Sequence, residues 1–291
     1  MEPVCACPDR LRLSFELKGV ISIHYVVCLK QVPDTTEVRI NPKTNTLMRE
    51  GVPSIINPYD AHAVEEALRL RDRYGGTVTL ICMGPPQARE SLKKALSIGA
   101  ERAILLSDRA FAGSDTLATS YILSQAIRKV AETEPVDLVL CGKQAIDGDT
   151  AQVGPGIARR LGFPQLTYVM QVDGIDLEKR EIQVHRKLEG ARQVVRSRLP
   201  ALLTVVKDLN EIRYASLPDM VRAARAEIAT WGKAEIGGDE SKMGLKGSPT
   251  TVRSIFAPPQ RAGGEIVPGD PAAAALELVQ KLVTSRVIAD A

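Results

Sequence analysis

Short runs of apolar, β-branched residues alternate with segments of helical periodicity between residues 23 and 161. Because strands that alternate with helices are covered on both faces, this pattern predicts an α/β fold, a Rossmann-like parallel sheet with flanking helices. The strands are expected at 23–32, 78–83, 103–106 and 137–141, and the helices at 61–74, 87–98, 116–130 and about 150–161. Ligands of such sheets bind beyond the carboxyl ends of the strands. A site is therefore expected among residues 28–34, 83–86, 107–115 and 141–153.

The sequence pattern changes after residue 165. In the segments that follow, apolar and polar residues nearly alternate, and Asp173-Gly174 and Glu189-Gly190 separate these segments. Such turns predict an antiparallel β extension, followed by an apolar strand at 201–206. The extension is expected at 167–172, 181–188 and 192–198. From about residue 230 the chain is rich in glycine, proline and charge and has too few apolar residues for a second core. We therefore expect an N-terminal extension at 1–22, one α/β domain at 23–229, and an extended C-terminal arm at 230–291 with a short helix at 271–283.

The first predicted helix follows a break at Asn57-Pro58-Tyr59-Asp60 and stops at Gly75-Gly76. Asp60 is the expected N-cap, because a carboxylate can accept the free amide hydrogens of a first helical turn.

The composition excludes several classes of protein. Hydrophobic residues make up 44% of the 291, enough to bury a core. The formal net charge is +3 and no run of five basic residues occurs, which argues against a nucleic-acid partner. No apolar run approaches the roughly 18 residues of a membrane-spanning helix. Residues 1–22 lack the basic start and apolar core of a secretory signal, so a cytoplasmic protein without a membrane span is expected.

The cysteines and histidines suggest no metal site. Cys28, Cys82 and Cys141 lie in predicted strands and are expected to be buried, reduced thiols. Cys5 and Cys7 have the spacing C-x-C rather than C-x-x-C. Of the three histidines, His62 is expected on a helix surface, and neither it nor His24 or His185 is expected to be catalytic.

The common catalytic and phosphate-binding motifs are absent. No G-x-G-x-x-G follows the first strand, and no G-x-x-x-x-G-K-[ST], G-x-S-x-G or H-E-x-x-H occurs. A hydrolase with a built-in nucleophile is therefore unsupported.

Residues 141–156, reading CGKQAIDGDTAQVGPG, are the most informative segment for chemistry. They leave a predicted strand, turn at Gly148 and enter a predicted helix, and Gly142 would let the backbone pass close to a ligand. Residues 150–153 are the expected first helical turn, whose free amides could bind a diphosphate. Alternatively, Asp149 merely caps the helix, and the residues alone leave both interpretations open. If phosphate binds, Asp147 and Asp149 are expected to brace the loop or contact a ribose, because carboxylates repel phosphate.

The run GKQAID at 142–147, with Gln152 and Gly154 after it, resembles the signature of electron transfer flavoprotein β-subunits. Further matching pieces in family order are residues 27–32, 57–58, 63–67, 84–85, 95–100 and 213–218. The resemblance covers about residues 23–260.

The resemblance implies a heterodimer with an α-subunit that carries much of the FAD site. It also implies a nucleotide site in this chain, where the backbone matters more than the side chain at Cys28, Asp60 and Met83. The implied cofactor-binding residues are Cys28, Asn57, Pro58, Tyr59, Asp60, Met83, Gly142, Lys143, Gln144, Ala145, Ile146, Asp147, Gly148, Asp149, Thr150, Ala151, Gln152 and Val153. No residue of this chain is expected to be catalytic, since a flavin carries the redox chemistry.

The segment at 214–225 resembles the family's recognition loop, in which a leucine enters an apolar pocket of a partner dehydrogenase. The implied partner-binding residues are Tyr214, Ala215, Ser216, Leu217, Pro218, Met220, Val221, Arg222 and Arg225. An ordinary amphipathic helix is the alternative. Implied partners are an acyl-CoA or other flavin dehydrogenase and, in some members, ferredoxin or flavodoxin.

The small residues Gly148, Thr150 and Ala151 resemble those of electron-bifurcating members, which hold a second FAD here and oxidise NADH. The alternative is AMP in this site, as in simpler members. Two other functions stay open: an enzyme acting on ATP, similar to the adenine nucleotide α-hydrolase group, and a nucleotide sensor without catalysis.

Overall fold

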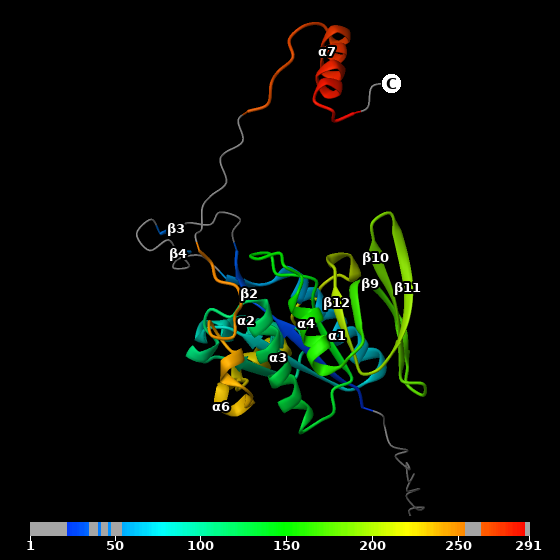
Figure 1. Cartoon of the computed structure of the whole chain (residues 1–291). Coiled ribbons are helices and arrows are strands. Elements are labelled where there is room, and N and C mark those ends of the chain that lie inside the picture. Colours follow the sequence, from blue (N-terminus) through cyan, green and yellow to red (C-terminus); the bar gives the residue numbers. More distant parts are fainter. Residues whose placement is uncertain (1–21, 35–39, 42–45, 48–53, 254–262, 289–291) are drawn as a thin grey trace, which may run out of the picture. The chain divides into compact units, whose positions relative to one another are not determined.

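The computed structural model describes residues 22–34, 40–41, 46–47, 54–253 and 263–288 (Figure 1). The chain divides into two units, one of Met1–Arg39 with Leu47–Arg253 and the other of Ile40–Thr46 with Ser254–Ala291. In the second unit, helix α7 (Pro271–Thr284) begins after Asp270, whose carboxylate accepts the amide hydrogens of Ala272 and Ala273. The short strands β3 (Ile40–Asn41) and β4 (Thr46–Leu47) pair with each other.

A nine-stranded sheet forms the centre of the first unit, in the order β11-β10-β9-β12-β8-β1-β6-β7-β13. Every pairing from β9 to β13 in this order is parallel, which confirms the predicted α/β fold. The parallel strands are β1 (His24–Leu29), β6 (Thr77–Met83), β7 (Arg102–Leu106), β8 (Leu138–Gly142), β9 (Gln165–Asp176), β12 (Ala201–Val205) and β13 (Ala229–Trp231).

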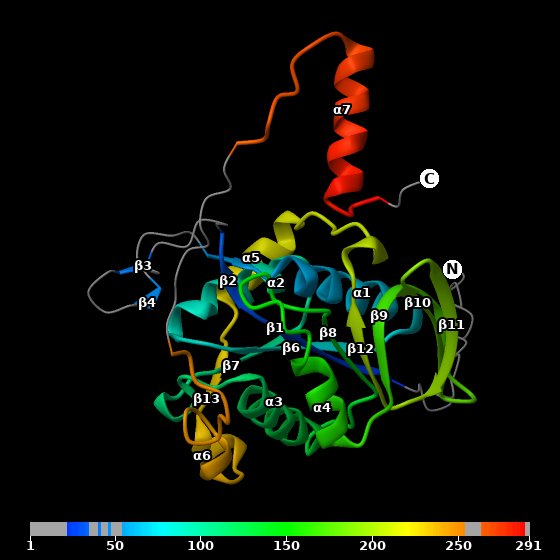
Figure 2. The same cartoon turned by 45° about the horizontal axis from the view of Figure 1, so that its top comes forward.

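Helices cover both faces of this sheet (Figure 2). On one face, α1 (Pro58–Tyr74) and α2 (Arg89–Ser97) pack through Leu68 and Leu92 against alternate strand residues such as Val27. On the other face, α3 (Thr116–Ala131) and α4 (Val153–Leu161) pack through Ile122 and Ile157. The alternation in β1 sends successive buried side chains to opposite faces, and this explains why the strand is apolar throughout.

The order of the strands creates a switch point at β1. After β1 the chain proceeds to β6 and β7 on one side, and it then crosses back to β8 on the other side. Crossovers that leave in opposite directions open a crevice at the carboxyl ends of the two strands concerned, here β1 and β8. The fold thus places the expected ligand site beyond Leu29 and Gly142.

The predicted antiparallel extension is present. Strands β10 (Glu181–Leu188) and β11 (Ala191–Arg198) form a hairpin, and β10 pairs antiparallel with β9. Strand β9 is longer than expected, because its beginning pairs in parallel with β12 and its later part belongs to the extension.

The first unit continues past the expected boundary at residue 230, which falls inside β13. This strand pairs with β7 and is the edge strand of the sheet. Beyond it, α6 (Lys233–Ile236) and the following loop bury Ile236 and Met243 against the face covered by α3 and α4. The apolar residues of this stretch are too few for a core of their own, but they complete the existing one.

The prediction of a single strand at 23–32 is wrong, because the strand is interrupted at Lys30. The amide of Lys30 donates to the Asp60 carboxylate at 2.8 Å, and its carbonyl accepts from the Asn57 amide at 2.8 Å. Because the amide and the carbonyl of Lys30 both bind residues at the start of α1, they cannot pair with a neighbouring strand, and β1 ends. The next residues form β2 (Gln31–Pro33), which pairs antiparallel with β5 (Ser54–Ile56).

Candidate functional site

Asn57 joins the start of α1 to the loop after β8. Its side-chain amide donates to the carbonyl of Gln144 at 2.8 Å, and its side-chain oxygen accepts from the amide of Ile146 at 3.2 Å. Asn57 is 1% exposed, so both contacts are shielded from water. The side chain therefore fixes the loop at 142–153 over the switch point, in the part of the fold where the sequence predicts a ligand.

Asp60 binds the ends of β1 and β8 together. One carboxylate oxygen accepts from the amide of Lys30 and the other from the amide of Gly142, each at 2.8 Å. The prediction that Asp60 is the helix N-cap is wrong: Asn57 occupies that position, Pro58 begins the helix, and Asp60 lies in its first turn. A carboxylate inside the first turn points toward the sheet, where two strand-end amides need an acceptor.

Gly142 is required for a different reason from the one expected. A β-carbon at this position would lie 2.5 Å from an oxygen of Asp60, 2.5 Å from the β-carbon of Tyr59 and 2.8 Å from the Asp60 amide nitrogen. The missing side chain thus makes room for the first turn of α1 rather than for a ligand.

Burial raises the pKa of Asp60 from 3.8 to about 6, and the hydrogen bonds from Lys30 and Gly142 offset this only in part. The native state therefore holds a proton that the unfolded chain releases between about pH 4 and pH 6. As the pH rises through this window, the contribution of Asp60 to the free energy of unfolding falls, by at most about 3 kcal/mol.

We expect Asp60→Asn to remove this pH dependence, because an amide does not titrate. Denaturant unfolding of both proteins between about pH 4 and pH 7 measures the effect. The difference in free energy of unfolding, variant minus wild type, should increase with pH. If this difference did not change with pH, the raised pKa of Asp60 would be contradicted. A loss of stability that is the same at every pH would come from replacing one carboxylate acceptor by an amide NH2 group.

The loop at 142–153 is braced by its own acidic residues. The ammonium group of Lys30 lies 2.7 Å from both carboxylate oxygens of Asp147, and the side-chain amide of Gln144 donates to Asp149 at 2.5 Å. The amide of Asp149 also donates to the carbonyl of Ala145 at 2.9 Å and closes a turn. Both aspartates thus brace the loop, which is one of the two roles expected of them, while contact with a ribose stays a prediction; the ion pair with Lys30 offsets the charge of Asp147.

The helix after this loop begins later than predicted. Helix α4 starts at Val153 with Gln152 as its N-cap residue, so Thr150, Ala151 and Gln152 are not its first turn. Asp149 and Ala151 have φ angles of +50° and +53°, a left-handed conformation that a helix cannot contain. Asp149 does not cap the helix either, since its carboxylate binds Gln144.

The turn that contains the left-handed residues leaves several backbone amides without a hydrogen-bond acceptor in the part of the chain that the structure describes. Within the described residues, the amides of Thr150, Ala151 and Val153 donate no hydrogen bond. Thr150 is exposed and Ala151 is half-buried. Successive free amides next to a helix N-terminus form a concave anion site. The free amides lie where the sequence predicts an anion site, although most of them belong to a turn rather than to a helix, and anion binding stays a prediction.

Cys28 and Met83 lie near the carboxyl ends of β1 and β6, as predicted, while Cys28 is buried and Met83 half-buried. In the register of the sheet, Cys28 stands opposite Cys141. Burial raises the pKa of the Cys28 and Cys141 thiols, so both are neutral and unreactive at neutral pH.

Three residues at the carboxyl edge of the sheet, Thr116, Tyr168 and Lys207, were not predicted as part of the site. Lys30 pairs with Asp147, and the hydroxyl of Thr116 at the start of α3 donates to Gln152 at 2.9 Å. The Lys143 ammonium lies 5.1 Å from the centre of the Tyr168 ring, and that of Lys207 lies 5.0 Å from the centre of the Tyr59 ring. Lys30 lies in the stretch 28–34, where the strand-end rule placed a site, whereas Thr116, Tyr168 and Lys207 carry no local signal.

The three histidines make structural contacts, and one of them, His62, is more buried than expected. His24 is fully buried in β1, where its ring contacts the Thr79 hydroxyl at 2.8 Å. His62 is half-buried and its ring contacts the side-chain oxygen of Asn210 at 2.9 Å, so it is not a surface residue of α1. His185 contacts Asp173 across the β9–β10 pair.

The segment at 214–225 contains the amphipathic helix α5 (Leu217–Arg225), and its role in partner recognition stays a prediction. Ser216 caps it by accepting the Asp219 amide. One face packs inward through Ala223, whereas Tyr214 is 99% and Leu217 73% exposed. Met220, Val221, Arg222 and Arg225 are also exposed, Pro218 is exposed, and Ala215 is half-buried. The predicted apolar anchor is thus available on the surface.

Fold and loop together define an α/β protein whose parallel sheet presents a turn with free backbone amides at its switch point. Residues 44–236 match the family model described as "Electron transfer flavoprotein domain". The chain is 57% identical over 241 residues to "Protein FixA" of Azotobacter vinelandii, covering 82% of this chain and 86% of the relative. It is 49% identical over 262 residues to "Electron transfer flavoprotein subunit beta" of Clostridium acetobutylicum, covering 89% and 98%. The corresponding protein of Megasphaera elsdenii is 47% identical over 270 residues, covering 90% and 99%.

The chain belongs to the electron transfer flavoprotein family, and its similarity to the β-subunits is confirmed. Among the described residues, no helix is long and apolar enough to cross a membrane. The same residues contain no group of three or more histidine, cysteine or acidic side chains arranged to hold a metal ion.

Proposed function

We propose that this chain is the β-subunit of a heterodimeric electron transfer flavoprotein and binds FAD at the switch point of its sheet. One observation carries the proposal: the loop at 142–153 is fixed by Asn57 and Lys30 while the amides of Thr150, Ala151 and Val153 stay free. Free amides suit a diphosphate, the group that FAD contains and AMP lacks. The bound flavin would accept and donate the electrons, and the protein would position it.

The space around Gly148 favours FAD over AMP. A β-carbon added to Gly148 would meet no atom within 4 Å, and its φ angle is not left-handed. Neither the turn nor the packing therefore requires glycine at this position. A cofactor that continues outward past the loop would explain a small residue better than AMP does. We accordingly propose the electron-bifurcating type, in which NADH is the donor and ferredoxin or flavodoxin is the low-potential acceptor.

The proposed α-subunit would contact the C-terminal arm. Leu276, Leu278 and Val279 of α7 are 69%, 49% and 49% exposed, and residues 263–266 have no helix or strand structure. A helix with exposed leucine and valine gains stability when a second chain covers it. A cytoplasmic location fits this assembly.

The exposed residues Tyr214, Leu217, Met220 and Val221 are proposed as the docking surface for a flavin dehydrogenase, such as an acyl-CoA dehydrogenase. An apolar anchor surrounded by polar groups is typical of small, specific interfaces. Arg222 and Arg225 provide such polar groups on the same helix.

Co-expression with the neighbouring α-subunit gene, followed by quantification of released cofactors, tests the proposed function. We expect a heterodimer with two FAD molecules and no AMP. One FAD and one AMP per heterodimer would leave the family assignment intact but refute the bifurcating type. A heterodimer that contains adenine nucleotide and no flavin would refute electron transfer and favour an ATP-acting enzyme or a sensor.

A further inference from the structure

Helix α1 buries two adjacent carboxylates. Glu65 and Glu66 are 3% and 4% exposed, although both belong to a residue type that is rarely buried without a partner. Burial raises the pKa of Glu66, and a hydrogen bond from Asn210 offsets this in part. Two buried carboxylates side by side require donors from another part of the chain.

The donors come from the segment at 210–213. Arg213 donates to Glu65 from its backbone amide at 3.1 Å and from its guanidinium Nε at 2.9 Å and Nη2 at 3.1 Å. Asn210 donates to Glu66 at 2.9 Å and also contacts His62. Residues 210–216 form neither helix nor strand, so side chains rather than a backbone ladder hold this segment in place.

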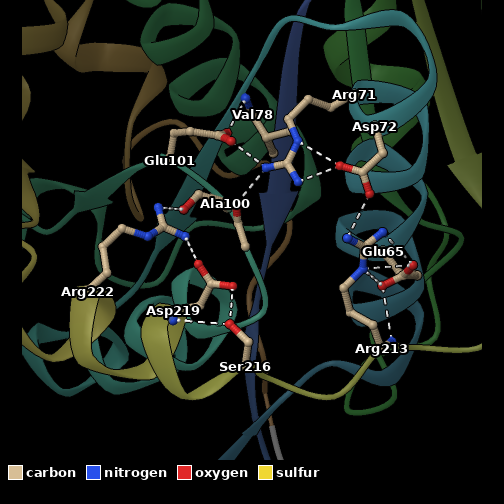
Figure 3. Close-up of polar contacts among 11 residues, drawn as sticks. Glu65, Arg71, Asp72, Val78, Ala100, Glu101, Arg213, Ser216, Asp219 and Arg222 are labelled. Atoms are coloured by element: carbon tan, nitrogen blue, oxygen red, sulfur yellow. Dashed lines mark hydrogen bonds and ion pairs between the residues drawn. The ribbon is translucent and has the colours of Figure 1, made fainter.

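The contacts continue along both sides of the segment (Figure 3). The Arg213 guanidinium also reaches Asp72 at 2.8 Å, and Asp72 in turn accepts from Arg71 at 2.7 Å. Arg71 pairs with Glu101, which accepts the amide of Val78 at the start of β6. At the other end, Arg222 donates to the carbonyl of Ala100 at 3.0 Å and to Asp219 at 2.8 Å.

This network holds the segment that contains two strongly exposed side chains, Tyr214 and Leu217. Tyr214 follows Arg213 directly, and Leu217 lies between Arg213 and Arg222 in the sequence. Both are exposed, so neither can hold the segment through packing of its own. Their positions depend on Arg213 at one end and, at the other, on Arg222 and the packing of Ala223.

We propose that Arg213, through its ion pair with the buried Glu65, is a positioning residue that fixes Tyr214 and Leu217 for docking of a flavin dehydrogenase, with Arg222 on the Ala100 carbonyl as the second anchor. The inference rests on the proposed docking surface. A segment held in its bound conformation before contact loses less conformational entropy on binding. The network thus increases affinity for the partner without contacting it.

Steady-state electron transfer between the heterodimer and a purified acyl-CoA dehydrogenase tests the proposal. Arg213→Ala should raise the KM for the dehydrogenase about tenfold or more, because the docking segment must then be ordered on binding. Reoxidation of the photoreduced heterodimer by a small redox dye and the flavin content should stay unchanged. Hydrogen–deuterium exchange of residues 210–222 should become faster. Leu217→Ala should raise the KM without changing this exchange.

Arg102→Ala is the matched control, since it removes an exposed arginine from an ion pair with Glu134 elsewhere in the fold. It should change neither the KM nor the exchange. Unchanged exchange and KM in Arg213→Ala, together with a raised KM in Leu217→Ala, would overturn the positioning role and leave the docking surface intact. Unchanged KM values in both variants would overturn the docking surface itself.

Arg213→Lys keeps the experiment decisive if Arg213→Ala fails to fold. Lysine retains the charge but cannot donate from two nitrogens to one carboxylate. It should give an intermediate KM and intermediate exchange. Wild-type values of both quantities in this variant would overturn the proposal.

Discussion

Ala151→Arg is expected to reduce the flavin content of the heterodimer from two to one and to lower NADH oxidation at least about a hundredfold. Ala151 belongs to the turn whose amides are proposed to hold the diphosphate, and its φ angle is +53°. Alanine and arginine have the same β-carbon, so the backbone strain is similar in both. The added side chain would instead fill the space over the free amides of Thr150 and Val153. Absorbance after cofactor release and NADH-dependent dye reduction measure the two effects.

Ala131→Arg is the matched control, because Ala131 is exposed at the C-terminal end of α3. It should keep both flavins and full NADH oxidation. If Ala151→Arg also retained two flavins, the proposed place of the diphosphate would be wrong. If it lost both, the variant would have damaged the heterodimer, and the ratio of the subunits in gel filtration would reveal this.

Gly142→Ala is expected to destabilise the first unit by about 3 kcal/mol, because overpacking of a closed contact costs roughly this much. The added β-carbon would lie within 2.5 Å of both Tyr59 and Asp60. The first turn of α1 must then move away from β8, and Asn57 must move with it. Thermal unfolding should show a loss of about 6–12 °C for a unit of this size. Since Asn57 holds the carbonyl of Gln144 and the amide of Ile146, flavin content should also fall.

Gly148→Ala provides the control within the same loop. A β-carbon at position 148 would have no atom within 4 Å, so the melting temperature of this variant should match that of the wild type. A loss of stability comparable to that of Gly142→Ala would contradict the close contact between α1 and β8 as the cause. A stable Gly148→Ala variant with weaker flavin binding would instead support close approach of the cofactor to this turn.

The parallel sheet was predictable because the signals for its elements are local. Apolar runs of strand length and helical periodicity recur along residues 23–161, and each can be recognised within a short window. The limits of the elements were less predictable. Lys30 ends β1 because the N-cap residue Asn57 and the helical residue Asp60 bind its backbone, and the pattern of apolar residues in 23–32 contains no sign of this.

The position of the candidate site in the fold was predictable from the sequence, but the backbone conformation that forms it was not. Asp147 and Asp149 were expected to brace the loop, and they do so through Lys30 and Gln144. The start of α4 was expected too early, because left-handed φ angles at Asp149 and Ala151 are unusual for these residue types. Only the folded backbone shows that a turn provides the free amides.

The sequence by itself determined the order of strands and helices, the family and the position of the loop, because each depends on residues close together in the chain. The tertiary structure decided the partners of the buried charges. Asp60 meets the amide of Gly142 across 82 residues, and Glu65 meets Arg213 across 148. A buried carboxylate needs donors, but its own sequence neighbourhood does not specify them. The fold selects them when it brings distant segments to one edge of the sheet or to one helix face.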